Sequence, residues 1–301
     1  MVRMVVVLVA AGVVLAVLLG ACVILVGGGA ETSSDTGPST ASHQSGPAVP
    51  GSWEVLEQGA AATCPGLAWS VLAAIGLVES DSGQSDAAGV ASGANAAGAE
   101  GPMQFEPATF AQYGVVGPGG VAPPSPYDPV DAIYSAARLL CADGAGRSGT
   151  LVAAIGDYNH SQTYVETVVV LAQALATDPE VPADAASALG FAAAQLGTPY
   201  RWGGTGNGGF DCSGLTQAAY RAAGIELPRV AQDQFNRGPA VPDGTVVRPG
   251  DLLFFGSSTH AVEHVGIYVG SGEMIDAPHT GAVVREEGAA WSNLVGATRP
   301  G

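Results

Sequence analysis

The decapeptide GGFDCSGLTQ, residues 208–217, places a cysteine between an aspartate and a serine, before a helix-like stretch. Its apolar spacing predicts a helix over 212–223, ended by Gly224. Asp211 suits the N-cap position, which puts Cys212 in the first helical turn. There the helix dipole and free N–H groups stabilise a thiolate, and they can also hold an oxyanion. Cys212 is therefore a candidate nucleophile.

The beginning of the chain contains an uncharged apolar segment, residues 4–26. It has roughly 23 residues, and a membrane span needs about 20. Arg3 precedes it and no acidic residue occurs before Glu31, so we expect the remainder outside the cell membrane. The alternatives are a cleaved signal peptide, which would yield a secreted protein, and a lipoprotein site at LGAC, residues 19–22. All three interpretations export the rest of the chain.

Export makes the four cysteines informative, because disulfides persist outside the cytoplasm. Cys64 and Cys141 each flank a helix-like stretch of the first domain, and we predict that they pair. Cys22 lies in the apolar segment, which leaves Cys212 alone in its domain. An unpaired thiol in an oxidising compartment indicates a function.

Composition breaks divide the chain into two segments of ordinary domain size. The predicted order is an anchor or signal segment, a flexible linker, a first domain, a short acidic linker with two prolines, and a second domain: 1–26, 27–51, 52–176, 177–186 and 187–301. The net charge of −17, with no lysine, argues against a nucleic-acid partner. No cofactor is predicted.

The second domain also contains a candidate partner for the thiol. Residues 251–255 and 264–269 read as strands, and alternation puts His264 on the face opposite Val265. An acceptor for its other ring nitrogen is expected on the next strand. A three-residue hairpin loop brings Asp276 diagonally opposite His264, whereas a two-residue loop brings His279 directly across. The spacing leaves both open.

A zinc site is the rival interpretation of Cys212 and His264. The second domain has no other cysteine and no C-x-x-C spacing. We therefore predict no metal site.

The motifs PYRWGG, FDCSGLTQ, RPGDLLFF and HVGIYVG occur in this order and resemble the NlpC-type cysteine peptidases of bacterial cell walls. The resemblance implies an α+β papain-like domain with Cys212 as nucleophile and His264 as general base. The third polar residue falls at Asp276, where aspartate departs from the family in type, and His279 is the fallback. The family cleaves peptidoglycan stem peptides, typically between D-γ-glutamate and a diamino acid. The resemblance also implies substrate contacts at Tyr200, Asp211 and Ser213.

The first domain offers a single glutamate. Residues 68–78 have apolar helical spacing and end at Glu79, where partial desolvation would keep a carboxyl protonated as a general acid. A water-exposed glutamate at a helix end is the plainer alternative. Asp81 is near in sequence but points elsewhere, so the usual second carboxylate of glycoside hydrolysis has no evident candidate.

The motifs VESDSG, GPMQFEPATF and YNHSQTYV resemble the lytic transglycosylases of lysozyme-like, all-α fold. In that family one glutamate makes both proton transfers, so Glu79 would protonate the glycosidic oxygen and then close a 1,6-anhydro ring without water. The Asn-His-Ser after Tyr158 and the Gly/Ala-rich loop 81–100 depart from the family. The resemblance implies sugar contacts at Ser80, Gln104, Tyr158 and Asn159.

The whole chain is thus predicted to be a bifunctional peptidoglycan hydrolase that cuts glycan strands and stem peptides. Its expected partners are those polymers, the cytoplasmic membrane through residues 4–26, and a secretion or conjugation apparatus for which it clears a path. The alternatives are a wall-binding scaffold with one or both sites inactive, and a lysozyme-type hydrolase in the first domain.

Overall fold

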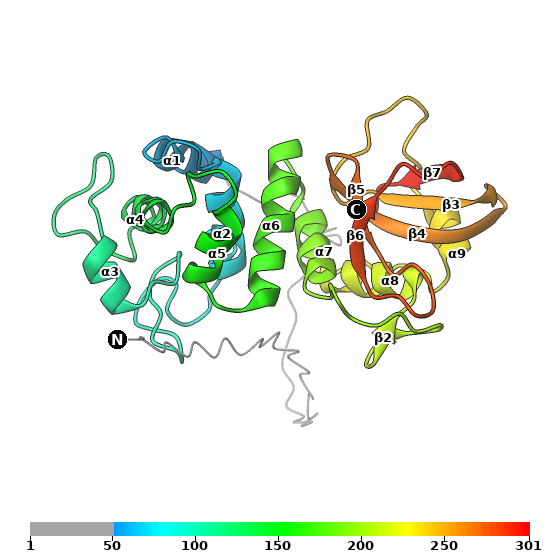
Figure 1. Cartoon of the computed structure of the whole chain (residues 1–301), viewed down its shortest axis with the longest axis horizontal. Helices are drawn as coiled ribbons and strands as arrows, with labels where there is room; N and C mark the ends of the chain where they lie inside the picture. The colour runs from blue at the N-terminus through cyan, green and yellow to red at the C-terminus, as the bar shows by residue number, and fades with distance from the viewer. Residues whose placement is uncertain (1–50) are drawn as a thin grey trace, which may run out of the picture. The chain divides into compact units, whose positions relative to one another are not determined.

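The computed structural model describes residues 51–301, which begin with helices and end with a sheet (Figure 1). The helices of the first part are α1 Gly51–Ala61, α2 Trp69–Ser80, α3 Pro107–Tyr113, α4 Pro129–Ala142, α5 Leu151–Tyr158 and α6 Gln162–Thr177. The second part contains the helices α7 Ala183–Ala193, α8 Cys212–Ala222 and α9 Ala231–Arg237. Its strands are β1 Thr205–Gly206, β2 Gly209–Phe210, β3 Leu252–Ser258, β4 Ala261–Gly270, β5 Glu273–Asp276, β6 Arg285–Gly288 and β7 Leu294–Thr298.

The predicted anchor or signal segment, 1–26, and the linker up to residue 50 lie outside the described residues. Within residues 51–301, no helix combines the length and the apolar character needed to cross a membrane. Helix α1 begins at Gly51, one residue before the predicted start of the first domain.

Helix α2 carries Glu79 in its last turn. Its middle is almost entirely apolar and buried, which drives the helix into the core. Asp81 follows in the left-handed conformation, with φ of 53°, and the N–H groups of Asp81 and Ser82 bond to the carbonyls of Leu77 and Gly76. This cap ends the helix and sets the direction of Glu79.

The Cys64–Cys141 disulfide is present, with the two Cα atoms 5.7 Å apart. It joins the segment between α1 and α2 to the last turn of α4, and 77 residues separate the two cysteines in sequence. The predicted pairing is confirmed. Cys212 is the free cysteine within residues 51–301.

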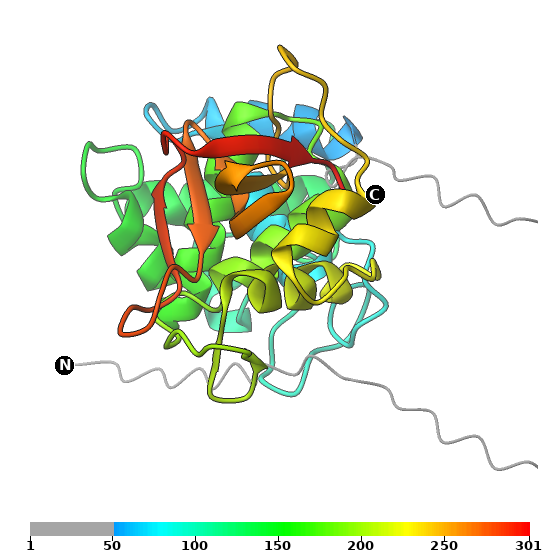
Figure 2. The same ribbon diagram turned by 90° about the vertical axis from the view of Figure 1, so that its right-hand side faces the viewer.

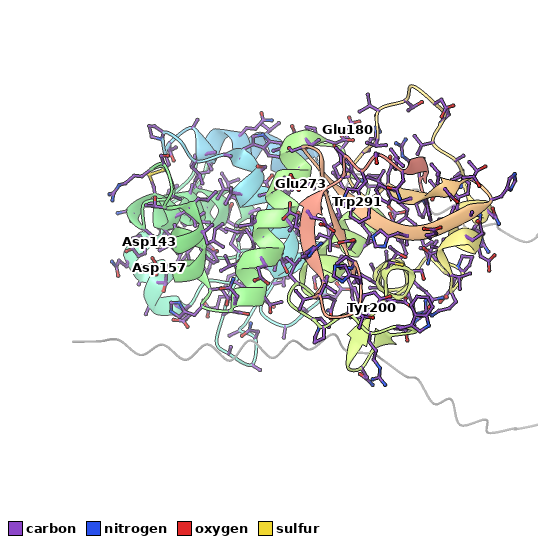
Figure 3. All side chains as sticks on the ribbon, turned by 45° about the vertical axis from the view of Figure 1, so that its right-hand side comes forward. Asp143, Asp157, Glu180, Tyr200, Glu273 and Trp291 are labelled. Atoms are coloured by element: carbon purple, nitrogen blue, oxygen red, sulfur yellow. A yellow bond between two sulfur atoms is a disulfide. The ribbon has the colours of Figure 1, made fainter. Side chains whose placement is uncertain are left out.

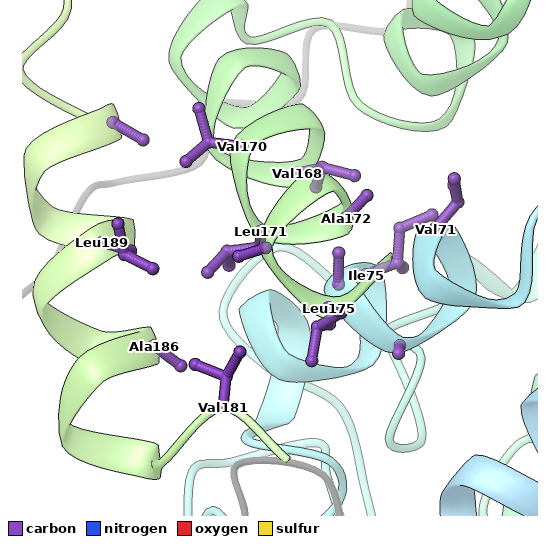
Figure 4. Close-up of a cluster of buried hydrophobic side chains, with 14 of the residues drawn as sticks. Val71, Ile75, Val168, Val170, Leu171, Ala172, Leu175, Val181, Ala186 and Leu189 are labelled. Atoms are coloured by element: carbon purple, nitrogen blue, oxygen red, sulfur yellow. The ribbon is translucent and has the colours of Figure 1, made fainter. Parts of the chain in front are cut away.

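Helix α6 packs against α2 and against α7. Figure 4 shows its buried side chains, including Val168, Leu171 and Leu175, with Ile75 of α2 on one side and Leu189 of α7 on the other. The connection between α6 and α7 is short, residues 178–182, and Val181 in it is buried. Helix α7 therefore begins inside the segment predicted as a linker, because Pro182 stands at its N-cap and the chain turns directly into the next helix.

The sheet is antiparallel, in the order β6-β5-β4-β3-β7, and helices α8 and α9 contact β4 (Figure 2). Helices packed against an antiparallel sheet make the second part α+β. The predicted alternation of β4 is confirmed, since Val265, Ile267 and Val269 are fully buried whereas His264 lies on the other face.

The β4–β5 hairpin answers the question of register. The turn itself has two residues, Ser271 and Gly272, because Gly270 pairs with Glu273. An irregularity between Tyr268 and Gly270 then skips one residue, so that Ile267 pairs with Ile275. The resulting parity is that of a three-residue loop.

Continuing that register places Asp276 opposite Gly266 and diagonal to His264. A Cβ at Gly266 would lie 3.3 Å from the Asp276 Cβ and 2.7 Å from the Met274 sulfur, so glycine leaves the room that the aspartate needs.

Candidate active site

Asp211 caps α8 and thereby fixes the position of Cys212. Its Oδ1 accepts a 2.8 Å hydrogen bond from the Gly214 N–H, and its Oδ2 accepts one of 2.9 Å from Gly203. Arg229 bonds both carboxylate oxygens, with Nη1–Oδ1 at 2.9 Å and Nη2–Oδ2 at 2.6 Å. Burial and this two-pronged contact hold the cap rigidly.

Cys212 is the first residue of α8 and is partly exposed. The N–H groups of Cys212 and Ser213 precede the first intrahelical hydrogen bond, so the helix itself leaves them free. A substrate oxygen next to the sulfur can therefore receive hydrogen bonds at the positive end of the helix dipole.

His264 lies between the thiol and a carboxylate. Its Nε2 is 2.6 Å from Asp276 Oδ2, and the Cys212 thiol interacts with the same ring. Since Asp276 occupies Nε2, the other nitrogen, Nδ1, is left for the thiol. Burial opposes the charged imidazole, but hydrogen bonds to Asp276 and Cys212 and the charges of both groups outweigh it and raise the pKa of His264 to about 9.

Two aromatic rings hold the imidazole in place. Trp291, which is labelled in Figure 3, stacks on His264, with ring centroids 5.1 Å apart and an interplanar angle of 19°. Phe255, directly opposite His264 on β3, lies 6.0 Å from the imidazole and 4.8 Å from Trp291. These contacts leave 12% of the His264 side chain exposed, so the ring is largely shielded from water but remains accessible from one side.

Tyr200, a predicted substrate contact, lies near enough to Cys212 for the charges of the two side chains to interact. Burial raises the pKa of its hydroxyl, and the negative charges of Cys212 and Asp211 raise it further. A short backbone bridge to Phe210 ties Tyr200 to the segment that leads into α8. The tyrosine hydroxyl is thus an available hydrogen-bond donor near the sulfur.

Asp211 and Ser213 are predicted substrate contacts, and both are nearly buried, at 8% and 5% exposure. The Ser213 hydroxyl accepts a hydrogen bond of 3.1 Å from Arg229 Nη1. Both Asp211 oxygens already accept two bonds each, from backbone N–H groups and from Arg229. A contact with the substrate amine stays a prediction, and it would have to be added to this network.

His279 is exposed in the loop after β5, and its Nδ1 lies 3.0 Å from the carbonyl of Thr280. Of the two candidates for the third position, Asp276 is the one in contact with His264.

The zinc alternative has one supporting spacing, since His260 and His264 form an H-x-x-x-H pair. His260, however, is exposed in the turn before β4. Among residues 51–301 no group of three or more His, Cys, Asp or Glu side chains is arranged to hold a metal ion.

Glu79 occupies a separate site in the helical part. Its Oε1 accepts a 2.7 Å hydrogen bond from the Tyr164 hydroxyl at the start of α6. Burial raises the pKa of Glu79 to about 7, although the bond from Tyr164 acts in the opposite direction. The pKa of Tyr158 is raised by burial and by the Glu79 charge, which shows that this tyrosine belongs to the same cluster.

The other predicted sugar contacts are mainly used within the protein. The Ser80 hydroxyl is buried and donates to the Pro102 carbonyl at 2.6 Å. Gln104 is half-buried and accepts from Asn95 at 2.8 Å. Asn159 is 8% exposed and accepts from the Ser161 N–H, and the Tyr158 hydroxyl donates to the Met103 carbonyl.

Sequence reasoning missed three side chains of the Cys212 site: Arg229, Trp291 and Glu287. Arg229 gave a weak signal in the sequence, because it is one of only 10 basic residues in an acidic chain and is flanked by apolar residues. Trp291 and Glu287 gave none, since their loop and strand are far from the motifs in sequence.

Residues 197–295 match the NlpC/P60 family. The chain is 47% identical over 88 residues to the gamma-D-glutamyl-L-lysine dipeptidyl-peptidase of Bacillus subtilis, covering 29% of each protein. It is 46% identical over 88 residues to the bifunctional muramidase/DL-endopeptidase CwlT of the same organism, covering 28% of this chain and 26% of CwlT. Among solved structures, it is similar to an NlpC/P60 family protein from Bacillus cereus. The sequence identity is 35% and the TM-score is 0.36, over 38% of this chain and 39% of that one.

The chain spans about a fifth to a third of the length of the curated relatives it matches. The range that matches the family contains Tyr200, Cys212, His264 and Asp276, whereas Glu79 lies outside it.

Proposed function

Since residues 197–295 form an NlpC/P60 domain, we propose that this part of the chain is a cysteine endopeptidase that cleaves peptidoglycan stem peptides. The observation that carries the proposal is the arrangement of Cys212 at the start of α8, near enough to His264 to raise the pKa of its ring, whose Nε2 is 2.6 Å from Asp276. The matched relative named a gamma-D-glutamyl-L-lysine dipeptidyl-peptidase supports a bond between D-γ-glutamate and a diamino acid as the target.

The proposed reaction follows from these positions. The Cys212 thiolate attacks the amide carbon, and the oxyanion receives hydrogen bonds from the start of α8 and from Tyr200. The C–N bond breaks as the His264 imidazolium gives its proton to the leaving amine. Water, deprotonated by His264, then hydrolyses the thioester and restores the thiolate. Asp276 holds the ring and stabilises its charged form throughout.

We infer a second activity for the helical part, cleavage of the glycan strand with Glu79 as general acid. The observation in its favour is a half-buried carboxyl with a pKa of about 7, bonded to Tyr164 and lying near Tyr158. With such a pKa, about half of the molecules carry the proton at pH 7 and can protonate a glycosidic oxygen. The matched relative CwlT is named a bifunctional muramidase/DL-endopeptidase, which supports two such activities in one chain.

The motif resemblance favours the lytic transglycosylase reaction over hydrolysis. In that reaction Glu79, once ionised, takes the proton of the sugar 6-hydroxyl, and a 1,6-anhydro ring closes without water. The alternative, a lysozyme-type hydrolase, needs a second carboxylate or an activated water near Glu79.

Digestion of purified peptidoglycan by the full chain, followed by mass spectrometry of the fragments, tests both proposals. We expect released stem peptides together with anhydromuramyl glycan ends. Reducing glycan ends would replace the transglycosylase with a hydrolase. Sacculi that retain the protein but stay uncut would overturn both activities in favour of a wall-binding scaffold.

We further propose that the chain acts at the outer face of the cell membrane, tethered by residues 4–26, and opens the wall locally for a secretion or conjugation apparatus. The uncharged N-terminal segment supports the tether. Fractionation of cells, with detection of the intact N-terminus, tests it: the full-length chain should remain with the membrane rather than in the medium.

A further inference from the structure

A second carboxyl group lies behind Asp276. Strand β6 runs beside β5, and Asp276 pairs with Arg285 while Met274 pairs with Glu287. Residues two apart on a strand share a face, so Arg285 and Glu287 lie on the same face of the sheet as Asp276. Glu287 is diagonal to Asp276, just as Asp276 is diagonal to His264.

The oxygen atoms of these two carboxyl groups are used unequally. Asp276 Oδ2 contacts His264 at 2.6 Å, and Glu287 Oε2 accepts a 2.8 Å bond from Arg285 Nη2. The remaining oxygens, Asp276 Oδ1 and Glu287 Oε1, are both buried, and no N–H or O–H group within residues 51–301 donates to either. The two side chains nevertheless lie close enough for the charge of Asp276 to raise the pKa of Glu287.

The only hydrogen that can join two carboxyl oxygens is a carboxyl proton. Two adjacent buried carboxylates do not both ionise, because the repulsion of like charges in a low-dielectric site disfavours it. Burial raises the pKa of Glu287, and the charge of Asp276 raises it further, against the opposing effect of Arg285. Asp276 must stay ionised to stabilise the charged ring of His264.

We propose that Glu287 is a positioning residue, whose protonated carboxyl donates a hydrogen bond to Asp276 Oδ1 and so aims Asp276 Oδ2 at His264. Arg285 holds Glu287 from the other side, where its guanidinium bonds Oε2. The chain of contacts then runs from Arg285 through Glu287, Asp276 and His264 to Cys212. The inference rests on the proposed function only in taking His264 as the partner of the Cys212 thiolate.

Glutamine at position 287 is the conservative replacement, because its amide N–H₂ can donate to Asp276 while its carbonyl accepts from Arg285. Leucine has a similar size but no donor. If the proton were instead on Asp276, the Glu287→Gln amide would have to present its oxygen to Asp276 and its N–H₂ to Arg285, and the two donors would repel. The pair of variants therefore reports both the contact and the direction of the hydrogen bond.

The first readout is independent of any peptidoglycan substrate. The rate at which iodoacetamide alkylates Cys212 in the full-length chain, measured from pH 5 to 9, follows the thiolate fraction. We expect Glu287→Leu to lower the alkylation rate at pH 6 about tenfold, because the loss of one charge-assisted hydrogen bond would shift the pKa of the Cys212–His264 pair by about one unit. Glu287→Gln should stay within about twofold of the wild-type rate. Glu286→Leu is the matched control, since it replaces a carboxyl side chain of the same size on the opposite face of β6 and should change the rate less than about twofold.

The second readout is stem-peptide cleavage, in which Glu287→Leu should lower kcat about tenfold with KM nearly unchanged. Equal alkylation profiles of the wild type and Glu287→Leu, in chains with matching circular dichroism, would overturn the proposal, as would a loss in Glu287→Gln equal to that in Glu287→Leu. If alkylation responds as expected but none of the variants or the wild type cleaves stem peptides, the proposed function fails while the positioning role stands.

Discussion

The Cys212 and Glu79 sites both hold a proton more tightly than their side chains do in water, but for opposite electrostatic reasons. At His264 the extra proton creates a charge, and Asp276 and the thiol stabilise that charge against burial. At Glu79 the proton removes a charge, and burial among apolar residues and tyrosines favours the neutral form. One fold thus provides an ion pair in the sheet part and a neutral acid in the helical part. The direction of a pKa shift therefore identifies the chemical role of a side chain only together with the physical cause of the shift.

Removing the sulfur is the largest expected perturbation. Cys212→Ala should lower stem-peptide release at least about a thousandfold, because no other described group can form the thioester, and should leave glycan cleavage within about twofold. Mass spectrometry of digested peptidoglycan measures both products in one reaction. A folded Cys212→Ala chain that had lost both activities would contradict the separation of the two sites.

Replacing the acid is the reciprocal change. Glu79→Gln keeps the shape of the side chain and can still accept from Tyr164, but it has no proton to give to the glycosidic oxygen. Glycan cleavage should fall about a hundredfold or more, with peptide release unchanged. The anhydromuramyl ends per disaccharide are the measurement, and retention of wild-type glycan cleavage would exclude Glu79 as the acid.

Removing the charge behind His264 should have an intermediate effect. Asp276→Asn keeps an acceptor for Nε2 but no longer stabilises the imidazolium, so the pKa of His264 should fall from about 9. We expect kcat for stem peptides to drop about tenfold and the alkaline limb of the pH profile to move to lower pH. His279→Ala, which alters the exposed histidine in the loop after β5, is the matched control and should leave the profile unchanged.

The Tyr164 hydroxyl tunes the acid. Glycan cleavage should decline as the pH rises through about 7, where Glu79 ionises. The bond from Tyr164 lowers the pKa of Glu79, so Tyr164→Phe should move that decline to higher pH. The shift should be one pH unit or less. At pH 8 the rate of Tyr164→Phe, as a fraction of its own maximum, should then be several-fold higher than the same fraction in the wild type. A decline that moved to lower pH would show that the hydroxyl stabilises the neutral acid instead.

Glu57 tests burial without catalysis. It is fully buried in α1, both oxygens lack a partner within residues 51–301, and burial, with a smaller effect of Glu54, raises its pKa to about 8. The folded state then binds a proton that the unfolded state releases above about pH 4.5, so the free energy of unfolding falls as the pH rises from about 4.5 to 8.

Glu57→Gln cannot ionise and should remove this decline, which amounts to about 4 kcal/mol at pH 8. Urea unfolding at pH 5 and at pH 8 measures it, and both cleavage activities should stay within about twofold. An equal loss of stability in the two chains over this pH range would show that Glu57 does not carry the buried proton.

Much of the Cys212 site could be predicted from local sequence, because each of its motifs acts over a few residues. A cap aspartate followed by a cysteine and a helical pattern places the thiol at a helix start, and alternation puts His264 on the face away from Val265. Likewise, an apolar run that ends in Glu79 predicts a carboxyl at the edge of a core.

The choice between Asp276 and His279 could not be made from spacing, because one skipped residue near Val269 changes the parity of the whole strand. Three further side chains join the site from distant positions in the sequence. Arg229 is 18 residues from Asp211, Trp291 is 27 residues from His264, and Glu287 is 11 residues from Asp276. No sequence periodicity predicts such contacts. The sequence by itself determined which groups are candidates for the chemistry, since helix caps and strand alternation are short-range effects. Only the tertiary structure decided which side chains orient and charge them, because that depends on how distant strands and loops pack.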